Sequence, residues 1–273
     1  MRLLLCGVRG STPATGAEFD RYGGNTSCVA FAHGDADPTL VVDGGTGLRR
    51  LSKILDRRAF RGTILLGHLH WDHTHGLPFF ASGDQDGARV DVLIPEQGDA
   101  SEVMARALGP PHFPVRLEDL RGDWSVAGLE PGKHDIEGFR VLARDIPHKM
   151  TRTYGFRISD NATSVAYMSD HWPARAPGEV AEFHETAREL ADGVDLLIHD
   201  AQYTQEEFNA RAHLGHATIE YAVGLAEACG ARELLLFHHD PERTDDEIDA
   251  LVQKYSTGAL PVRAAAEGHV IDL

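Results

Sequence analysis

Short apolar runs that end in glycine, aspartate or histidine recur along the chain. Runs of about four to eight apolar and β-branched residues between turn residues are typical of buried strands. The strands that these runs predict cover residues 3–6, 29–32, 40–42, 63–66, 90–94, 139–146, 154–158, 164–168, 195–198 and 233–237. The turn residues at 160–162 join two of them into a hairpin.

Longer segments between the strands predict helices over residues 48–55, 101–108, 179–192, 218–229 and 245–255. A further helix start is expected at Thr74, and Gly109-Pro110-Pro111 ends the second helix. Residues 112–138 are rich in turn residues, and we expect an irregular flap there over the functional face. The pattern alone indicates an α/β fold with two layers or more.

Residues of the types that bind metals stand where the predicted strands end. These positions are Asp43, His68, His148, Asp170, His199 and His238. Polar residues scattered over a surface would not fall at strand ends so regularly. We therefore expect these side chains to share one site.

The densest group of such residues is His68-Leu69-His70-Trp71-Asp72-His73, which directly follows a predicted strand. Neutral imidazole and carboxylate suit zinc and related divalent metals. A surface loop rich in histidine is the alternative, but the strand, loop and helix start around the motif favour a metal site. Because so short a stretch cannot complete two tetrahedral sites, further ligands must come from distant segments.

Composition narrows the class of protein. The chain has 273 residues, 42% of them hydrophobic and 25% charged, which is ordinary for a globular protein. Its net charge of −16 argues against binding a long polyanion, but bound cations can reverse the field around a small phosphorylated substrate. Three scattered cysteines, no signal peptide and no apolar stretch long enough to span a membrane favour the cytoplasm.

The motif from His68 to His73, extended through Gly76-Leu77-Pro78, resembles the signature of the metallo-β-lactamase fold hydrolases. It looks most like their phosphodiesterase branch, which includes the tRNA 3′-end processing nucleases (tRNase Z). The resemblance covers nearly the whole chain. It implies a single domain over residues 1–273, a four-layer αββα sandwich with metals at one edge between the two sheets.

The resemblance also implies two divalent metal ions, with zinc favoured over manganese or iron. One ion would take His68, His70 and His148 as ligands. The other would take Asp72, His73 and His238, with Asp170 bridging the two. His239 competes with His238 for the last position, and we favour His238 because it directly follows the strand.

Further roles follow from the same resemblance. His213-Leu214-Gly215-His216-Ala217-Thr218 is similar to a motif of the phosphodiesterase branch, so His216 and Asp72 are the expected catalytic residues. The alternative for this segment is a simple helix start with Thr218 as its cap. The expected supporting residues are Asp43, behind the metal loop, and His199 and Asp200, which would orient Asp72 or His216. Independently of the resemblance, the glycine-rich loop makes Asn25, Thr26 and Ser27 candidates for binding phosphate, with plain loop packing as the alternative. His75 and His171 receive no role.

These observations predict a dinuclear metal-dependent hydrolase. Its expected substrate is a cyclic nucleotide or other small phosphodiester, attacked by metal-bound hydroxide. The alternatives are a carboxylic ester, thioester or lactam hydrolase of the same fold, or a non-catalytic metal-binding sensor. Residues 148–170 leave room only for a hairpin in place of the arm that grips tRNA, so long nucleic acid is not expected. The sequence leaves a monomer and a homodimer open.

Overall fold

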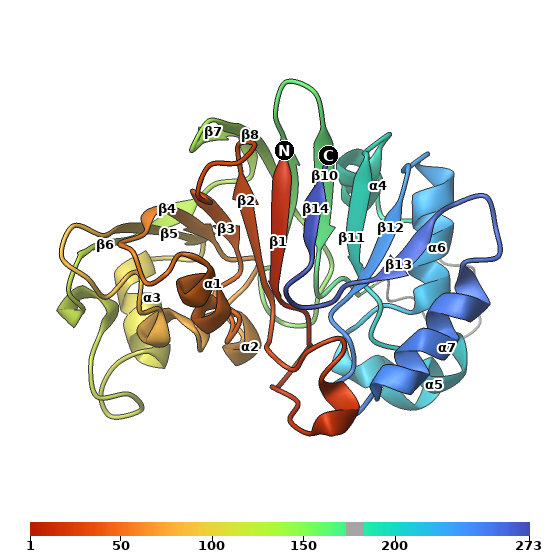
Figure 1. The fold of residues 1–273 in the computed structure, drawn as a ribbon, viewed down its shortest axis with the longest axis horizontal. Coiled ribbons are helices and arrows are strands. Elements are labelled where there is room, and N and C mark those ends of the chain that lie inside the picture. The colour runs from red at the N-terminus through yellow and green to blue at the C-terminus, as the bar shows by residue number, and fades with distance from the viewer. Residues whose placement is uncertain (173–182) are drawn as a thin grey trace.

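The computed structural model describes residues 1–172 and 183–273, which form two facing β-sheets with helices on both outer sides (Figure 1). The first sheet has the strand order β14-β1-β2-β3-β4-β5-β6. Its strands are β1 Arg2–Gly7, β2 Cys28–Ala32, β3 Leu40–Val42, β4 Arg61–Leu65, β5 Arg89–Pro95, β6 Asp123–Leu129 and β14 Val270–Asp272. Pairing of β14 with β1 brings the two termini together.

The second sheet has the order β13-β12-β11-β10-β9-β8-β7. Its strands are β7 Gly132–Ile136, β8 Phe139–Asp145, β9 Tyr154–Ser159, β10 Ser164–Met168, β11 Leu196–Asp200, β12 Leu234–Phe237 and β13 Val262–Ala264. Strands β3 to β6 run parallel in one sheet, and β10 to β13 run parallel in the other. The carboxyl ends within each parallel set therefore lie at one edge of their sheet.

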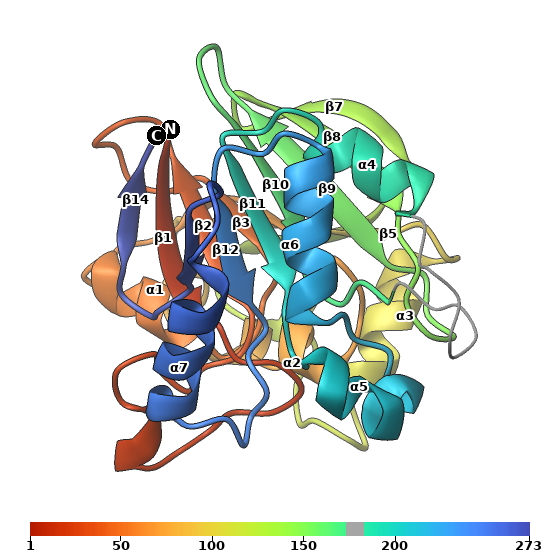
Figure 2. The same ribbon diagram turned by 90° about the vertical axis from the view of Figure 1, so that its right-hand side faces the viewer.

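Helices cover the outer faces of both sheets. The α-helices are α1 Leu48–Ile54, α2 Trp71–Thr74, α3 Ala100–Ala107, α4 Glu185–Ala191, α5 Gln205–Arg211, α6 Ile219–Ala228 and α7 Asp245–Tyr255. Helices α1 and α3 pack on the first sheet, and α4 and α6 pack on the second. Figure 2 shows α6 and α7 on the outer side of the second sheet. No helix within residues 1–172 and 183–273 is long and apolar enough to cross a membrane.

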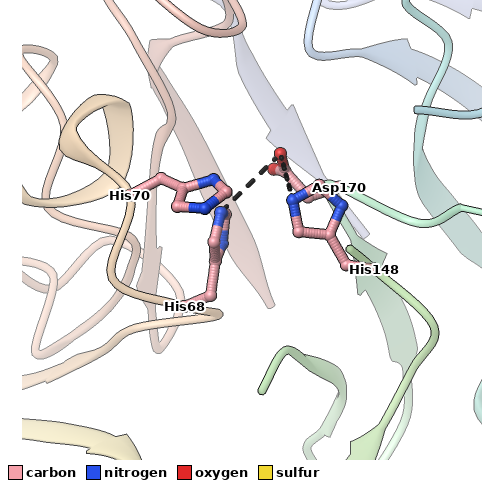
Figure 3. Close-up of side chains that lie close together, drawn as sticks. All are labelled: His68, His70, His148 and Asp170. Carbon is pink, nitrogen blue, oxygen red and sulfur yellow. Dashed lines mark ion pairs between the residues drawn. The ribbon is translucent and has the colours of Figure 1, made fainter. Parts of the chain in front are cut away.

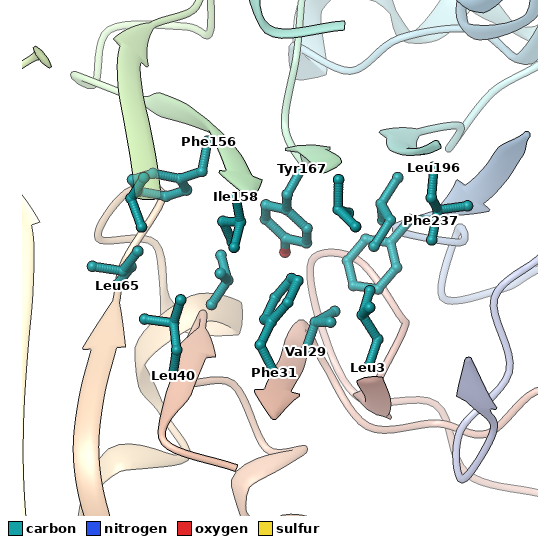
Figure 4. Close-up of a cluster of buried hydrophobic side chains, with 14 of the residues drawn as sticks. Leu3, Val29, Phe31, Leu40, Leu65, Phe156, Ile158, Tyr167, Leu196 and Phe237 are labelled. Carbon is teal, nitrogen blue, oxygen red and sulfur yellow. The ribbon is translucent and has the colours of Figure 1, made fainter. Parts of the chain in front are cut away.

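Apolar side chains from the inner faces of both sheets fill the space between them (Figure 4). Phe31 of β2 meets Phe139 of β8 edge to face, with ring centroids 6.3 Å apart. Separate apolar clusters lie beneath the helices on each outer side. Four layers with three apolar interfaces confirm the predicted αββα sandwich.

The predicted flap over residues 112–138 is wrong, because this segment supplies β6 and β7. Both are edge strands, and their side chains are mostly exposed or half-buried, so they lack the apolar run that marked the inner strands. The short strands β13 and β14 and helix α5 were also not predicted. Part of the helix predicted over 179–192 lies outside the described residues, and α4 begins at Glu185.

One buried hydrogen-bond group ties the two sheets together at the edge where the ligands gather. Tyr167 of β10 donates its hydroxyl to Asp43 Oδ2, which follows β3, at 2.6 Å. Asp43 Oδ1 accepts from the backbone N–H of Gly67 at 2.8 Å. The Gly67 carbonyl accepts from the backbone N–H of Tyr154, also at 2.8 Å. The loop before His68 is therefore held from both sheets.

We expect Tyr167→Phe to lower the free energy of unfolding by about 1–3 kcal/mol, because it leaves a buried carboxylate oxygen without this donor. Tyr22→Phe is the matched control, since it removes a similar 2.7 Å bond to Asp249 on the exposed surface. That change should cost less than about 0.5 kcal/mol. Urea unfolding of both variants measures the difference, and equal losses would contradict the role of the buried bond.

Candidate metal centre

Histidine and aspartate side chains from both sheets meet at this edge in three overlapping groups. Two of them share Asp170, and the third consists of Asp200, His216 and His238. The first group is His68, His70, His148 and Asp170, and the second is Asp72, His73, Asp170 and His238. Within each group, the ligand atoms all lie within 4.8 Å of one another. Such an arrangement suits two neighbouring metal ions.

The first group surrounds one oxygen of Asp170 (Figure 3). The Nε2 atoms of His68 and His148 each lie 3.8 Å from Asp170 Oδ1. His70 is exposed, and its ring centroid is 4.3 Å from that of His68. His68 and His70 come from the loop after β4, whereas His148 precedes β9 and Asp170 follows β10.

The second group gathers around the other oxygen of Asp170. His73 Nε2 lies 2.9 Å and His238 Nε2 lies 3.2 Å from Asp170 Oδ2. Asp72 Oδ2 lies 3.1 Å from His238 Nε2 and accepts the backbone N–H of Ser11 at 2.8 Å. All four side chains of the group are buried. Asp170 thus faces both groups, one oxygen toward each.

The protonation of this cluster fits divalent metal ions. Burial lowers the pKa values of His68, His70 and His148, which leaves neutral imidazoles that can act as ligands. The Nε2 atoms of His68 and His148 are buried without a hydrogen-bond partner. Burial alone would raise the pKa values of Asp72 and Asp170, but the neighbouring histidines outweigh it and hold both well below their usual range. Anionic carboxylates beside unpaired imidazole nitrogens call for a bound cation.

The pKa values of His73 and His238 are raised, in contrast to those of the first group. Burial acts to lower their pKa values, but the surrounding carboxylates outweigh it. The pKa of His238 rises to about 9, and that of His73 also lies well above its usual value. In the metal-free chain, protons on these rings supply positive charge to the second group.

Backbone geometry fixes the loops that carry the ligands. Asp43, Asp170 and His238 adopt positive φ angles of 63°, 53° and 58° directly after their strands. Such conformations are costly for residues other than glycine and cluster at functional sites. Gly76 packs against the Gly45 carbonyl so closely that an added Cβ would lie 1.8 Å from that oxygen. The metal loop therefore fits only with glycine at this contact.

His216 stands beside the metal ligands and is held by Asp200. Its Nδ1 lies 3.0 Å from Asp200 Oδ2 and 3.7 Å from Asp170 Oδ1. Asp200 Oδ1 accepts the backbone N–H of Gln202 at 3.0 Å, which fixes the carboxylate. Thr218 does cap α6, and this cap holds the segment that carries His216.

His199 does not contact the residues that it was predicted to orient, and His239 belongs to neither ligand group. His199 was expected to orient Asp72 or His216, but its Nε2 lies 2.9 Å from His171 Nδ1, and its Nδ1 faces the Asp200 carbonyl. The reason is the alternation of side chains along β11, which turns neighbouring residues to opposite faces. His239 Nε2 lies 2.9 Å from the carbonyl of Ala265, so it points away from both groups while His238 points into the second.

The expected phosphate-binding residues do not face the site. Thr26 and Ser27 are fully buried, and the backbone N–H of Thr26 donates to Thr46 Oγ1 at 2.9 Å. Asn25 Nδ2 donates to Glu267 at 2.9 Å. The Ser27 carbonyl accepts from Gly45 N, beside the metal loop. These positions do not support contact with substrate, and these residues instead pack behind the loop.

A cavity of about 410 Å³ opens onto the two groups. Its described lining is Ser11, Leu69, His70, Trp71, Asp72, Asp170, Leu214 and His216. Ser11 was missed in the sequence, although it lies in a glycine-rich turn, because no local pattern shows that its backbone N–H reaches Asp72. Gln202 was missed likewise, and its side chain donates to Ser11 Oγ at 3.1 Å.

Comparisons with known proteins agree with this geometry. The family model described as "Beta-lactamase superfamily domain" matches residues 39–239. The chain is 24% identical to Ribonuclease Z of Natronomonas pharaonis, over 91% of this chain and 92% of that protein. Its fold is similar to the metallo-beta-lactamase fold protein YhfI from Bacillus subtilis, with a TM-score of 0.73, 20% identity and 99% of each chain covered. A diphosphatase from the PhnP family matches with a TM-score of 0.71 at 17% identity, over 100% of this chain and 97% of that one.

We expect about two zinc ions per chain after loading, given the two ligand groups. His68→Ala and His238→Ala should each lower that number, whereas His75→Ala should not, because the exposed His75 ring lies outside both groups. Elemental analysis after gel filtration measures the content, and circular dichroism checks that each variant is folded. Full occupancy in both folded ligand variants would contradict the assignment.

Metal binding should also release protons. Because the pKa of His238 is about 9, this ring carries a proton at pH 7.5 in the metal-free chain, and a bound ion must displace it. Zinc affinity should therefore fall as the pH falls. Calorimetry in buffers of different ionisation enthalpy should show release of at least about one proton per chain. Binding without proton release would mean that His238 is not a ligand.

Proposed function

Because this chain belongs to the beta-lactamase superfamily, we propose that it is a dinuclear phosphodiesterase that cleaves small phosphodiesters. It is a metal-dependent hydrolase. The observation that carries the proposal is the pair His216 and Asp200 next to Asp170, because a phosphodiester with an alkoxide leaving group needs a proton donor beside the metal centre.

The residues that would hold the metals come from both sheets. The ligands are His68, His70 and His148 for one ion, Asp72, His73 and His238 for the other, and Asp170 between them. This set of imidazoles and carboxylates favours zinc over manganese and iron, although the same ligands can bind all three metals. Such ions, when bound, lower the pKa of a water molecule and neutralise charge on the phosphoryl group.

His216 acts as the general acid in this proposal. Asp200 holds its Nδ1, which leaves Nε2 as the nitrogen that can face a substrate in the cavity. An alkoxide leaving group needs a proton as its bond to phosphorus breaks, and an imidazolium can donate one near neutral pH. The carboxylate of Asp200 fixes the direction of the ring.

The proposed substrate is small, such as a cyclic nucleotide. No lysine or arginine lines the cavity among the residues that the structure describes. The net charge of −16 repels a long polyanion, and residues 154–168 form only the hairpin of β9 and β10. This site therefore suits a small substrate that is bound by a few groups close to its scissile phosphate, and not a long nucleic acid that is bound through many phosphates.

A second candidate is the processing of tRNA 3′ ends. The match to Ribonuclease Z from Natronomonas pharaonis, over most of both chains, favours it. The acidic surface argues against it. The match to Ribonuclease Z supports phosphodiesters over carboxylic esters, thioesters and lactams. A metal-binding sensor would need no His216 beside its ligands.

We also propose the cytoplasm as the compartment. All three cysteines are free, and Cys6 and Cys28 lie buried beside each other without a disulfide. Burial raises the pKa of the Cys28 thiol well above its usual value, which keeps it unreactive. Neighbouring free thiols suit a reducing environment.

The acid role predicts a dependence on the leaving group. His216→Ala should slow hydrolysis of a cyclic nucleotide by on the order of 10²–10⁴-fold. The same variant should slow bis(p-nitrophenyl) phosphate much less, because p-nitrophenolate leaves without protonation. Steady-state rates with both substrates measure the contrast.

Asp200→Asn is the companion variant, and it should show the same contrast in weaker form. Metal content of both variants must match that of the unchanged chain. Equal loss with both substrates, with metals in place, would show that His216 positions phosphate and does not act as an acid.

Binding of tRNA separates the two candidate functions. We expect weak binding at both salt concentrations, because the cavity lacks lysine and arginine among its described residues. Filter binding of precursor tRNA at about 50 and 200 mM salt, together with analysis of 3′ ends, makes the comparison. Tight binding at the higher salt with release of a mature 3′ end would overturn the small-substrate proposal.

A further inference from the structure

We propose that Trp71, with Leu69 and Leu214, forms an apolar rim that binds a flat aromatic group of the substrate. The inference rests on the proposed function and narrows its substrate class to phosphodiesters that carry an aryl group or a nucleobase. The three side chains line the same cavity as Asp72, Asp170 and His216.

Trp71 is one of the most exposed large hydrophobic side chains among the described residues. Its exposed fraction is 68%, although it stands between His70 and the buried Asp72 in the metal loop. The indole stacks on the ring of His75, with centroids 5.3 Å apart and planes 20° apart. This contact covers one face and sets the orientation of the ring. The rest of the indole is open to a ligand.

The lining of the cavity has a buried polar part and an exposed part of mixed chemistry, in which Trp71 and Leu214 stand beside Ser11 and His70. The polar residues Asp72, Asp170 and His216 are nearly fully buried and form its floor. Leu214 is 47% exposed and stands at the mouth with Trp71. Because Leu69 and Trp71 come from the metal loop and Leu214 from the segment before His216, the apolar side chains belong to two separate segments that carry catalytic groups.

This division indicates what the substrate must offer. The floor matches a phosphate and its metals, and the exposed lining offers the rest of the substrate one aromatic face and apolar surface beside Ser11 and His70. Aromatic rings and nucleobases stack on an indole, and stacking contributes about 1–3 kcal/mol for each base. Stacking tolerates different bases, so the rim selects for aromatic character and not for one nucleobase.

A pair of phosphonates tests the rim without turnover. Phenylphosphonate and methylphosphonate carry the same anionic group and differ in the aromatic ring. Calorimetry on the zinc-loaded protein should show phenylphosphonate binding tighter by on the order of tenfold. Trp71→Ala should reduce this preference to less than about twofold, and Trp71→Phe should keep most of it, since a phenyl ring also stacks.

Phe79→Ala is the matched control. Phe79 is 56% exposed and packs edge to face on Phe113, but it does not line the cavity, so the preference should stay. Metal content and circular dichroism of all variants must match the unchanged chain.

A preference that survives Trp71→Ala, or no preference in the unchanged chain, would overturn the proposal. A dimer that dissociates on Trp71→Ala with the preference intact would overturn it too, because the indole would then belong to a contact between copies. A preference that depends on Trp71 in a protein that cleaves no phosphodiester would keep the rim and defeat the proposed function. Cleavage of phosphodiesters by a protein that shows no preference for phenylphosphonate would keep the proposed function and defeat the rim.

Discussion

The buried carboxylate of Asp170 is the group on which the arrangement of this site depends. Its two oxygens face different ligand groups, so one side chain sets the separation of both. A charge with 1% exposure is tolerable only beside cations or strong donors, and five histidines surround it. The fold must bring these histidines from both sheets to a single point.

Parallel strands meet this requirement because they end at a shared edge. The two sheets then need a link that keeps their edges in register. The hydrogen bonds from Tyr167 to Asp43 and from Gly67 to the same carboxylate supply it within the core. Asp43 also lies 2.8 Å from His73 Nδ1, so the group that joins the sheets directly orients a metal ligand.

The sequence was most informative where apolar runs ended in ligand residues. The inner strands and the αββα layers were predicted from these runs and from the resemblance, which the family match confirms. The edge strands β6 and β7 were missed because exposed strands lack apolar runs. The motif from His68 to His73 marked the site, but contacts such as the bond from Ser11 to Asp72 join residues 61 positions apart, and no local pattern contains them.

The residues that select the substrate could not be predicted from the sequence for the same reason. Trp71 is one residue inside a metal-binding motif, and its neighbours in the chain are ligands, so its position alone suggests a supporting role. Only the structure shows that the ring of Trp71 is exposed and that it lines the same cavity as Leu214, which is distant in sequence. The proposed ligands, mostly buried and constrained by metal chemistry, leave little freedom to distinguish substrates. The exposed rim can vary without disturbing them, so selectivity for the group attached to phosphorus belongs there.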